Sequence, residues 1–204
     1  MIRMNERIKS EILEAWIKDI PFDDVSWTSL CRIAQSMGHD KNIALELFPQ
    51  KVPSALSDLS ASFDQKMCDQ LNDLDITSIS IRDRIRNATM TRISIMAEHK
   101  ESYRKIAVYW ANPLRGFAAK KIIWNTADHI WNWAGDKSTD YNYYTKRGLL
   151  SGVLATTYIF WLQDNTENAY KTEDFLQRRI ENVVKIGQFI NSTKNKIRER
   201  SQRN

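Results

Sequence analysis

Proline and glycine are scarce in this sequence, whose 204 residues include only four Pro and six Gly. Loop-rich β sandwiches and barrels use both residues at their many turns, so this scarcity argues against a β fold. Cysteine is scarcer still: Cys31 and Cys68 stand far apart, without the spacing of metal ligands. A disulfide framework and a cysteine-based zinc site are therefore excluded, and the isolated thiols favour a reducing, intracellular setting.

Long apolar runs are also missing, because no stretch approaches the roughly 20 residues that a membrane-spanning helix needs. The first residues form neither a signal peptide nor a transit peptide, since Glu6, Glu11 and Glu14 follow closely on Met1. The abundance of Ile, Lys and Asn is typical of an AT-rich bacterial genome. We therefore expect a protein of the bacterial cytoplasm.

Catalytic signatures are absent as well. The sequence has no Gly-rich phosphate loop and no G-x-S-x-G elbow, and His39, His99 and His129 belong to no metal-binding pair. The Ser, Cys and His residues show no spacing that would indicate a nucleophile paired with a base. We therefore expect a protein that is not an enzyme, with no catalytic residue, no metal and no cofactor.

What the sequence does contain is helical periodicity from end to end. Apolar residues recur at helical spacing before Pro21, between Ser26 and Gly38, and again from 40 to 48. Three short helices joined by brief turns are typical of a helix-turn-helix unit, which we assign to residues 1–52.

A larger all-α bundle is predicted for residues 53–190, followed by a basic tail at 191–204. The segment 76–99 is ambiguous at its start, where Ile79 and Ile81 alternate as in a strand, but a helix fits its full length better. The helices expected in the bundle are 53–71, 76–99, 114–133, 142–162 and 172–190.

The helix-turn-helix unit raises the hypothesis of a DNA-binding regulator. A recognition helix should present Arg, Lys, Asn or Gln to bases, with cations for the phosphates. The helix at 40–48 offers Lys41 and Asn42 but also Asp40 and Glu46, so its charge is close to neutral. The unit is therefore interpreted first as a structural piece, with DNA binding as the alternative.

Residues 131–147 read WNWAGDKSTDYNYYTKR. This run resembles the signature of the ninth Coq protein family of ubiquinone biosynthesis, approximately W-x-x-A-G-D-x-S-T-D-x-N-x-Y-T-[KR]-R. Further resemblance lies at 48–49, 81–85, Pro113, 156–157, 161–164 and 175–180, so it extends over nearly the whole chain.

The resemblance implies a fold like that of the TetR repressors, homodimeric through its C-terminal helices, with an apolar pocket in the larger domain. It also implies a non-catalytic accessory protein that binds isoprenoid lipids and presents a quinone intermediate to the demethoxyubiquinone hydroxylase. The alternative function is a TetR-type, ligand-responsive transcriptional regulator. The resemblance further implies that the hydroxylase docks on a patch formed by Ile130, Asp140, Tyr143, Tyr144 and Arg147.

The residues themselves agree with such a patch. Gly135 can end the helix at 114–133, and Ser138, Thr139 or Asp140 can cap the next one. Tyr143 and Arg147 then share one helical face, and interface hot spots are rich in Tyr and Arg. The alternative is that Arg147 only pairs with Asp140 or Asp136.

A prenyl tail would need apolar walls, and the region 124–161 is rich in suitable side chains. Most of them would also be apolar in any bundle core, and this alternative stays open. The candidates for lipid contact are Trp124, Trp131, Leu149, Val153, Leu154, Phe160 and Trp161.

The C-terminal tail departs from many relatives, which continue into an amphipathic membrane-docking helix. Here the last residues carry five cations against Glu199. Such a tail can contact anionic lipid transiently, at about 1 kcal/mol per cation, or remain a solvated end. We therefore expect at most peripheral contact with the inner membrane.

Overall fold

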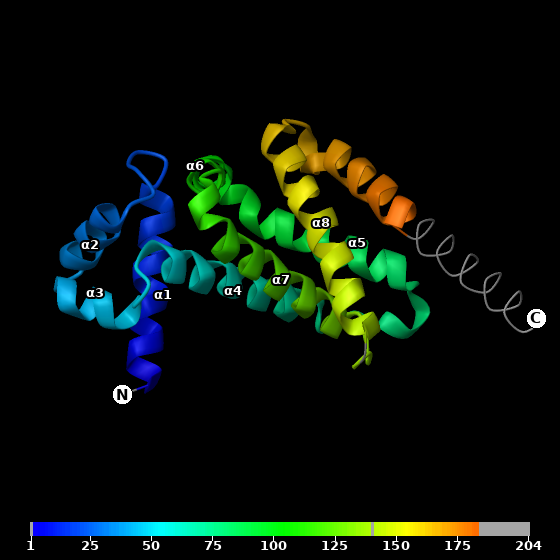
Figure 1. Ribbon diagram of the computed structural model, residues 1–204, viewed down its shortest axis with the longest axis horizontal. Helices are drawn as coiled ribbons and strands as arrows, with labels where there is room; N and C mark the ends of the chain where they lie inside the picture. Colours follow the sequence, from blue (N-terminus) through cyan, green and yellow to red (C-terminus); the bar gives the residue numbers. More distant parts are fainter. Residues whose placement is uncertain (1, 140, 184–204) are drawn as a thin grey trace, which may run out of the picture.

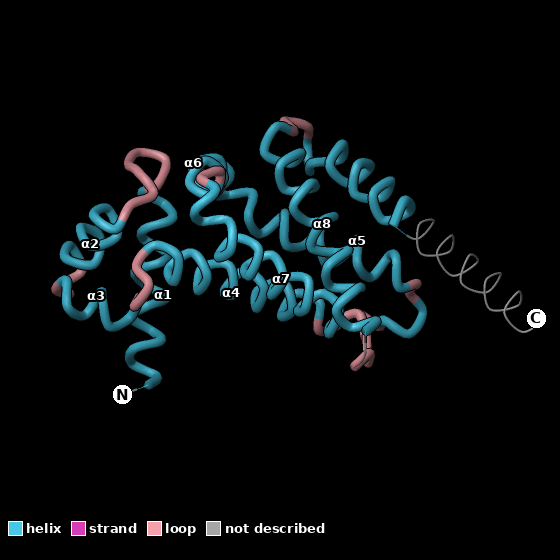
Figure 2. The backbone as a smooth tube through the Cα atoms, in the orientation of Figure 1, coloured by secondary structure: helices cyan, strands magenta, loops and turns pink. Residues whose placement is uncertain are grey.

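The regular structure is entirely helical wherever the chain is described. The computed structural model describes residues 2–139 and 141–183, and contains no strand within them (Figures 1 and 2). The all-α prediction is therefore confirmed. Asp140, the expected continuation of the last helix to residue 190, and the basic tail at 191–204 lie outside the described residues.

A small group of three helices lies beside a larger bundle (Figure 1). The small group holds α1 to α3, and the bundle holds the helices that follow. In chain order the helices are α1 (Ile2–Asp19), α2 (Trp27–Ser36), α3 (Lys41–Leu47), α4 (Val52–Leu71), α5 (Ile81–Met96), α6 (Lys100–Trp110), α7 (Gly116–Trp133) and α8 (Tyr141–Gln163), with a last helical stretch at 170–183.

The ends of the short helices follow from their capping residues. The Ser26 side chain accepts the backbone N–H of Ser29 at the start of α2, and Asp40 accepts those of Asn42 and Ile43 at the start of α3. Gly38 has a φ of 85°, the left-handed conformation that favours glycine between two helices. The predicted helix-turn-helix connectivity is therefore present in α1–α3.

Two segments of the bundle differ from their prediction. Residues 76–78 form a 3₁₀ turn, and Ser80 then caps α5, so the helix starts five residues later than 76–99 requires. A 3₁₀ turn at 97–99 separates α5 from α6, a helix that the sequence pattern does not predict.

The core connects the small group to the bundle. One cluster of buried side chains runs from α1, α2 and α3 into α4, α5 and α6, while a second occupies the other end of the bundle. Trp16 on α1 donates its indole N–H to Ser29 Oγ at 3.0 Å, and Ser102 on α6 donates to the Ile17 carbonyl at 2.6 Å. The boundary proposed at residue 52 coincides with the start of α4, but packing crosses it.

Gly135 ends α7 as the sequence predicts. Its φ is 85°, its N–H donates to the Asn132 carbonyl, and the next N–H, that of Asp136, donates to the Trp131 carbonyl. This pair of bonds is the Schellman arrangement, which satisfies the last carbonyls of a helix. Arg84 on α5 donates to the Ala134 carbonyl at 2.7 Å and secures the same turn.

Asp164 directs the chain from α8 into the helix at 170–183. Its two carboxylate oxygens accept the backbone N–H and the hydroxyl of both Thr166 and Thr172, at distances from 2.5 to 2.9 Å. Four hydrogen bonds on one buried carboxylate fix the direction of the last helix, whose Leu176 and Ile180 enter the second core cluster.

Candidate functional site

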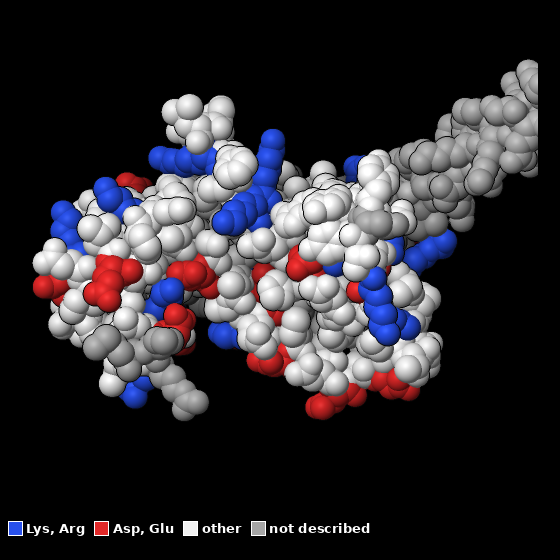
Figure 3. All heavy atoms as spheres, turned by 60° about the horizontal axis from the view of Figure 1, so that its bottom comes forward, with Lys and Arg blue, Asp and Glu red and all other residues white. Residues whose placement is uncertain are grey.

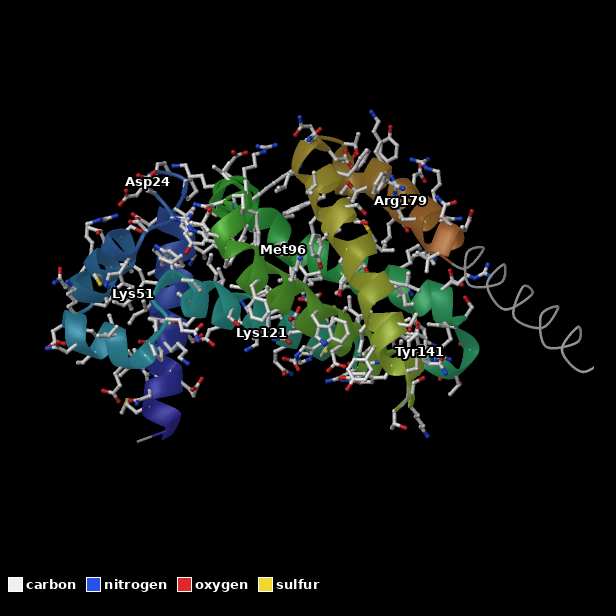
Figure 4. The ribbon with its side chains drawn as sticks, viewed as in Figure 1. Asp24, Lys51, Met96, Lys121, Tyr141 and Arg179 are labelled. Atoms are coloured by element: carbon white, nitrogen blue, oxygen red, sulfur yellow. The ribbon has the colours of Figure 1, made fainter. Side chains whose placement is uncertain are left out.

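A cavity of about 360 Å³ lies inside the bundle between α4, α5, α6, α7 and α8. Each of these helices contributes residues to its wall, and Met96, labelled in Figure 4, is the apolar contribution of α5. The volume falls in the range of roughly 300–1,000 Å³ typical of small-molecule pockets. The apolar lining includes Leu56, Leu59, Met96, Ile106, Trp110, Ile122, Ile123, Ile159, Trp161 and Leu162.

One wall of the cavity carries a buried charged cluster. Arg92 on α5 donates its Nε to Asp64 Oδ1 on α4 at 2.7 Å and its Nη2 to Ser60 Oγ at 2.8 Å. Thr126 on α7 donates to the other oxygen of Asp64 at 3.1 Å. Every member of the cluster is buried, and together they form a polar contact between three helices in an otherwise apolar region.

Two tyrosines line the cavity beside this cluster. Burial raises the pKa of both Tyr103 and Tyr158 above the ordinary value for a phenol, so both are neutral at physiological pH. The guanidinium of Arg92 lies 5.3 Å from the centre of the Tyr158 ring. The cavity thus combines apolar walls with a few hydroxyl groups at one side.

Of the seven lipid-contact candidates, only Trp161 lies in the cavity wall. Val153 and Leu154 are buried in the second core cluster, where Trp131 packs against them, and Phe160 stacks on Phe175 at 4.5 Å. Leu149 is exposed, and Trp124 lies near Tyr144, with 6.3 Å between ring centres. The face of α8 toward the cavity instead carries Ala155, Tyr158, Ile159 and Leu162.

A second polar centre lies where α7, its following loop and α8 meet. Arg147 is only 1% exposed and donates Nε to Asp128 Oδ1 at 2.5 Å, Nη1 to Asp136 Oδ2 at 2.9 Å and Nη2 to Asn132 Oδ1 at 3.2 Å. Its guanidinium also lies 3.5 Å from the centre of the Tyr143 ring. Arg147 is therefore a buried cation. Its ion pair with Asp136 is one of the two that the alternative interpretation of the sequence names.

Asp136 is the carboxylate of this centre that two cations contact. Lys146 donates to its Oδ1 at 2.6 Å, while Arg147 occupies its Oδ2. Burial raises the pKa of Asp136, but the hydrogen bonds from Lys146 and Arg147 outweigh this effect and lower it to about 2. The carboxylate consequently stays ionised at any physiological pH.

The five residues expected in the docking patch are not equally accessible. Ile130 is 0% exposed and Arg147 almost fully buried, so in this structure neither reaches the surface, because both fill the α7–α8 contact. Tyr143 is half-buried and donates its hydroxyl to Asp128 Oδ1 at 3.0 Å, whereas Tyr144 is 64% exposed. Asp140 lies outside the described residues. The exposed part of the patch is therefore Tyr144, with Tyr141 beside it on the first turn of α8.

Several residues of both centres were not singled out from the sequence. Asp128 and Asn132 are four residues apart on α7, a spacing that places both on one face toward Arg147. Asp64 and Arg92 come from different helices, and no short-range spacing marks them as a pair.

Neither centre has the character of a metal site. Within residues 2–139 and 141–183, no three His, Cys, Asp or Glu side chains gather closely enough to hold an ion. Over the same residues, no helix combines the length and the apolar character that crossing a bilayer demands.

Comparison with known proteins points to one family. Residues 118–187 match the COQ9 family, which includes most of α7, the connection and α8. The chain is 29% identical over 103 residues to the mitochondrial ubiquinone biosynthesis protein COQ9 of Rattus norvegicus, an alignment covering 50% of this chain and 33% of the relative. It is 22% identical over 194 residues to the COQ9 of Drosophila melanogaster, covering 92% of this chain and 59% of the relative.

The aligned part thus spans about a third of the length of most curated relatives. Among solved structures, a TetR transcriptional regulator from Nitrosomonas europaea superposes with a TM-score of 0.66 at 16% identity, covering 86% of this chain and 97% of that one. This likeness shows the TetR-like fold alone and confirms the predicted fold class. Through the segment that carries both the signature and the Arg147 centre, the chain is similar to the COQ9 family.

Proposed function

We propose that this chain is a non-catalytic, lipid-binding accessory factor of ubiquinone biosynthesis. It binds an isoprenoid quinone intermediate in the cavity between α4 and α8 and presents it to the demethoxyubiquinone hydroxylase. It works as a homodimer in the bacterial cytoplasm. The observation that carries the proposal is an apolar cavity of about 360 Å³ in a chain whose α7–α8 segment matches the COQ9 family.

The cavity wall suits a prenyl tail on energetic grounds. Burying one CH₂-sized group yields about 0.8 kcal/mol, so one five-carbon isoprene unit contributes roughly 4 kcal/mol before the costs of ordering. The lining supplies aliphatic side chains from four helices and the flat rings of Trp110 and Trp161. A long lipid would occupy this space with part of its tail.

The exposed first turn of α8 supports a docking role. Tyr141 and Tyr144 are both exposed, and aromatic side chains are enriched among the residues that dominate protein interfaces. The Arg147 centre beneath them fixes the angle between α7 and α8, so the two tyrosines stand on a rigid support. In this proposal Tyr144 contacts the hydroxylase, and Arg147 positions the surface without touching the partner.

The test is organic extraction and mass spectrometry of the natively purified chain, compared with a variant whose cavity is filled. Ala155 lines the cavity, so Ala155→Phe should remove the bound lipid. Ala61 is a solvent-exposed alanine of α4 outside the lining, so Ala61→Phe is the matched control and should retain it. An isoprenoid quinone in the wild type and the control but not in Ala155→Phe supports the proposal. Absence of lipid in the wild type, or equal lipid in all three proteins, contradicts it.

The alternative, a ligand-responsive DNA-binding regulator, draws on the helix-turn-helix unit of α1–α3 and on the likeness in fold to a TetR regulator. The exposed side chains of α3 include Lys41 and Glu46, which cancel in charge. This neutrality favours the lipid-binding proposal, because a duplex reader needs a cationic surface.

A further inference from the structure

The turn between α6 and α7 exposes apolar side chains to an unusual degree. Leu114, in the 3₁₀ turn Pro113–Arg115, is 94% exposed, and Phe117 in the first turn of α7 is 84% exposed. We call this segment, residues 112–121, the α6–α7 tip. In Figure 3 blue Lys and Arg side chains are more frequent toward the upper edge of the view, and red Asp and Glu side chains toward its lower edge. Adjacent exposed apolar groups of this size mark a contact surface.

The stretch of sequence that contains the tip carries charge of a single sign. Between residues 102 and 127 the chain carries five cations and no acidic residue, whereas in total it has 30 Lys and Arg against 25 Asp and Glu. The rest of the chain is therefore formally neutral. The cations are Arg104, Lys105, Arg115, Lys120 and Lys121. Arg104 pairs with Glu101 and Lys105 donates to the Asp23 carbonyl, so the cations of the tip itself are Arg115, Lys120 and Lys121.

The cations nearest the tip are held where they can act together with the apolar residues. Phe117, Lys120 and Lys121 occupy positions i, i+3 and i+4 of α7 and so share one face, and both lysines are exposed (Figure 4 labels Lys121). Helical side chains lean toward the N-terminus, which here is the tip. Arg115 stacks on Tyr109 at 3.8 Å and donates Nη1 to the Tyr109 carbonyl at 3.0 Å.

We propose that the α6–α7 tip docks on an anionic lipid bilayer. Leu114 and Phe117 enter the boundary of the hydrocarbon layer, while Arg115, Lys120 and Lys121 lie against the head-group phosphates. Apolar residues at the end of a protein, surrounded by cations, match both layers of such a membrane. A second copy of this chain fits poorly, because two tips placed together would bring their cations into mutual repulsion.

Docking of the tip goes beyond lipid binding, since it does not depend on what the cavity holds. It also gives the proposed function a route for its ligand. Ala111 and Ala119 both line the cavity, one of them three residues before Leu114 and the other two residues after Phe117. A docked tip therefore places one wall of the cavity next to the bilayer, so that a prenyl tail can enter without crossing water.

The experiment is co-sedimentation of the full chain with vesicles of phosphatidylcholine, with and without phosphatidylglycerol. The first variant is Leu114→Ser/Phe117→Ser, expected to weaken partitioning into the mixed vesicles about a hundredfold, because two large apolar side chains no longer insert. The second is Lys120→Gln/Lys121→Gln, expected to weaken it about thirtyfold, since each cation near an anionic surface contributes roughly a further fivefold. All four side chains are exposed, so the circular dichroism spectra of both variants should match that of the wild type.

Matched controls lie elsewhere on the surface. Phe22 is 89% exposed in the turn after α1, close to Asp23 and Asp24, so Phe22→Ser should leave vesicle binding unchanged. Lys171 and Arg178 are exposed cations of the helix at 170–183, and their paired replacement by Gln controls for the loss of two charges.

The proposal is supported if anionic vesicles bind the wild type and the controls but bind both tip variants weakly. It is overturned if the wild type does not bind anionic vesicles. It is also overturned if the tip variants bind as well as the wild type, because the contact would then lie in another part of the chain. It is also overturned if sedimentation equilibrium shows the tip variants changing from dimer to monomer without a change in vesicle binding. Each result stands whether or not lipid is extracted from the cavity, so failure of docking and failure of the proposed function are distinguishable.

Discussion

Arg147 of α8 and Asp136 of the α7–α8 connection form a buried ion pair, with Nη1 2.9 Å from Oδ2 and both side chains no more than 5% exposed. The same guanidinium reaches Asp128 on α7, so one side chain ties together a helix, the loop after it and the next helix. Asp136 and Arg147 are both part of the 131–147 run that resembles the family signature. That run therefore holds structural partners as well as surface residues.

Replacing Arg147 should destabilise the protein. Arg147→Ala would leave Asp136 and Asp128 without their main cation, and breaking a buried pair by removing one partner costs about 3–5 kcal/mol. Urea denaturation monitored by circular dichroism measures the change in the free energy of unfolding. An Arg147→Ala protein as stable as the wild type would contradict the structural role of this pair.

Tyr144 provides the complementary prediction, which depends on the proposed docking. Tyr144→Ala should leave the free energy of unfolding within about 0.5 kcal/mol, because the side chain is exposed. Its affinity for the purified hydroxylase, measured by calorimetry, should fall about thirtyfold if the tyrosine is a hot spot. Tyr170→Ala, at an exposed tyrosine of the last helix, is the matched control. Equal affinities for the two variants would remove Tyr144 from the interface.

Lowering the pH should destabilise the protein, because two buried carboxylates become protonated. For Asp136 and Asp164 burial raises the pKa, but hydrogen bonds, from Lys146 and Arg147 in one case and from Thr166 and Thr172 in the other, lower each to about 2. Because these values lie below those of the unfolded chain, each group contributes roughly 2 kcal/mol above pH 4, lost as the pH falls toward 2. Thermal unfolding between pH 7 and pH 2 measures this loss, and Asp136→Asn should flatten its pH dependence. A melting temperature that stays constant down to pH 2 would contradict the assignment.

Much of the fold follows from local signals in the sequence. Ser26, Asp40 and Gly38 define the ends of α2 and α3, and Gly135 ends α7, each through chemistry that acts over a few residues. The separation of α5 from α6 had no such signal. The break is a 3₁₀ turn at 97–99 that contains neither Gly nor Pro, so the pattern passes through it unmarked.

The cavity was harder to predict because its wall depends on which stripe of each helix turns inward. Along α8, almost every residue from 149 to 162 is apolar or small, but the residues that line the cavity are Ala155, Tyr158, Ile159, Trp161 and Leu162. Periodicity cannot choose between stripes of a helix that is apolar on several sides. Asp64 and Arg92 raise the same difficulty, since their contact exists only once α4 packs on α5.

The Asp64–Arg92 pair permits a double-mutant cycle in the cavity wall. Arg92→Met alone leaves the buried Asp64 uncompensated and should cost about 3–5 kcal/mol of stability, as should Asp64→Leu. The double variant Asp64→Leu/Arg92→Met should lose less than either single one, because replacing a buried pair with apolar groups is often neutral or stabilising. Urea denaturation of the four proteins provides the cycle. Strict additivity of the two single effects would show that the pair is not coupled.

The last prediction concerns DNA binding by the helix-turn-helix unit of α1–α3. On the exposed surface of α3, Lys41 is offset by Glu46, and Asp40 is occupied in capping the helix. We therefore expect no binding to random duplex DNA in fluorescence anisotropy at low salt, where phosphate contacts are strongest. Lys41→Glu should then leave the anisotropy signal unchanged. Binding that falls steeply with salt and is abolished by Lys41→Glu would instead favour a ligand-responsive regulator, because only a cation acting on phosphates gives that combination.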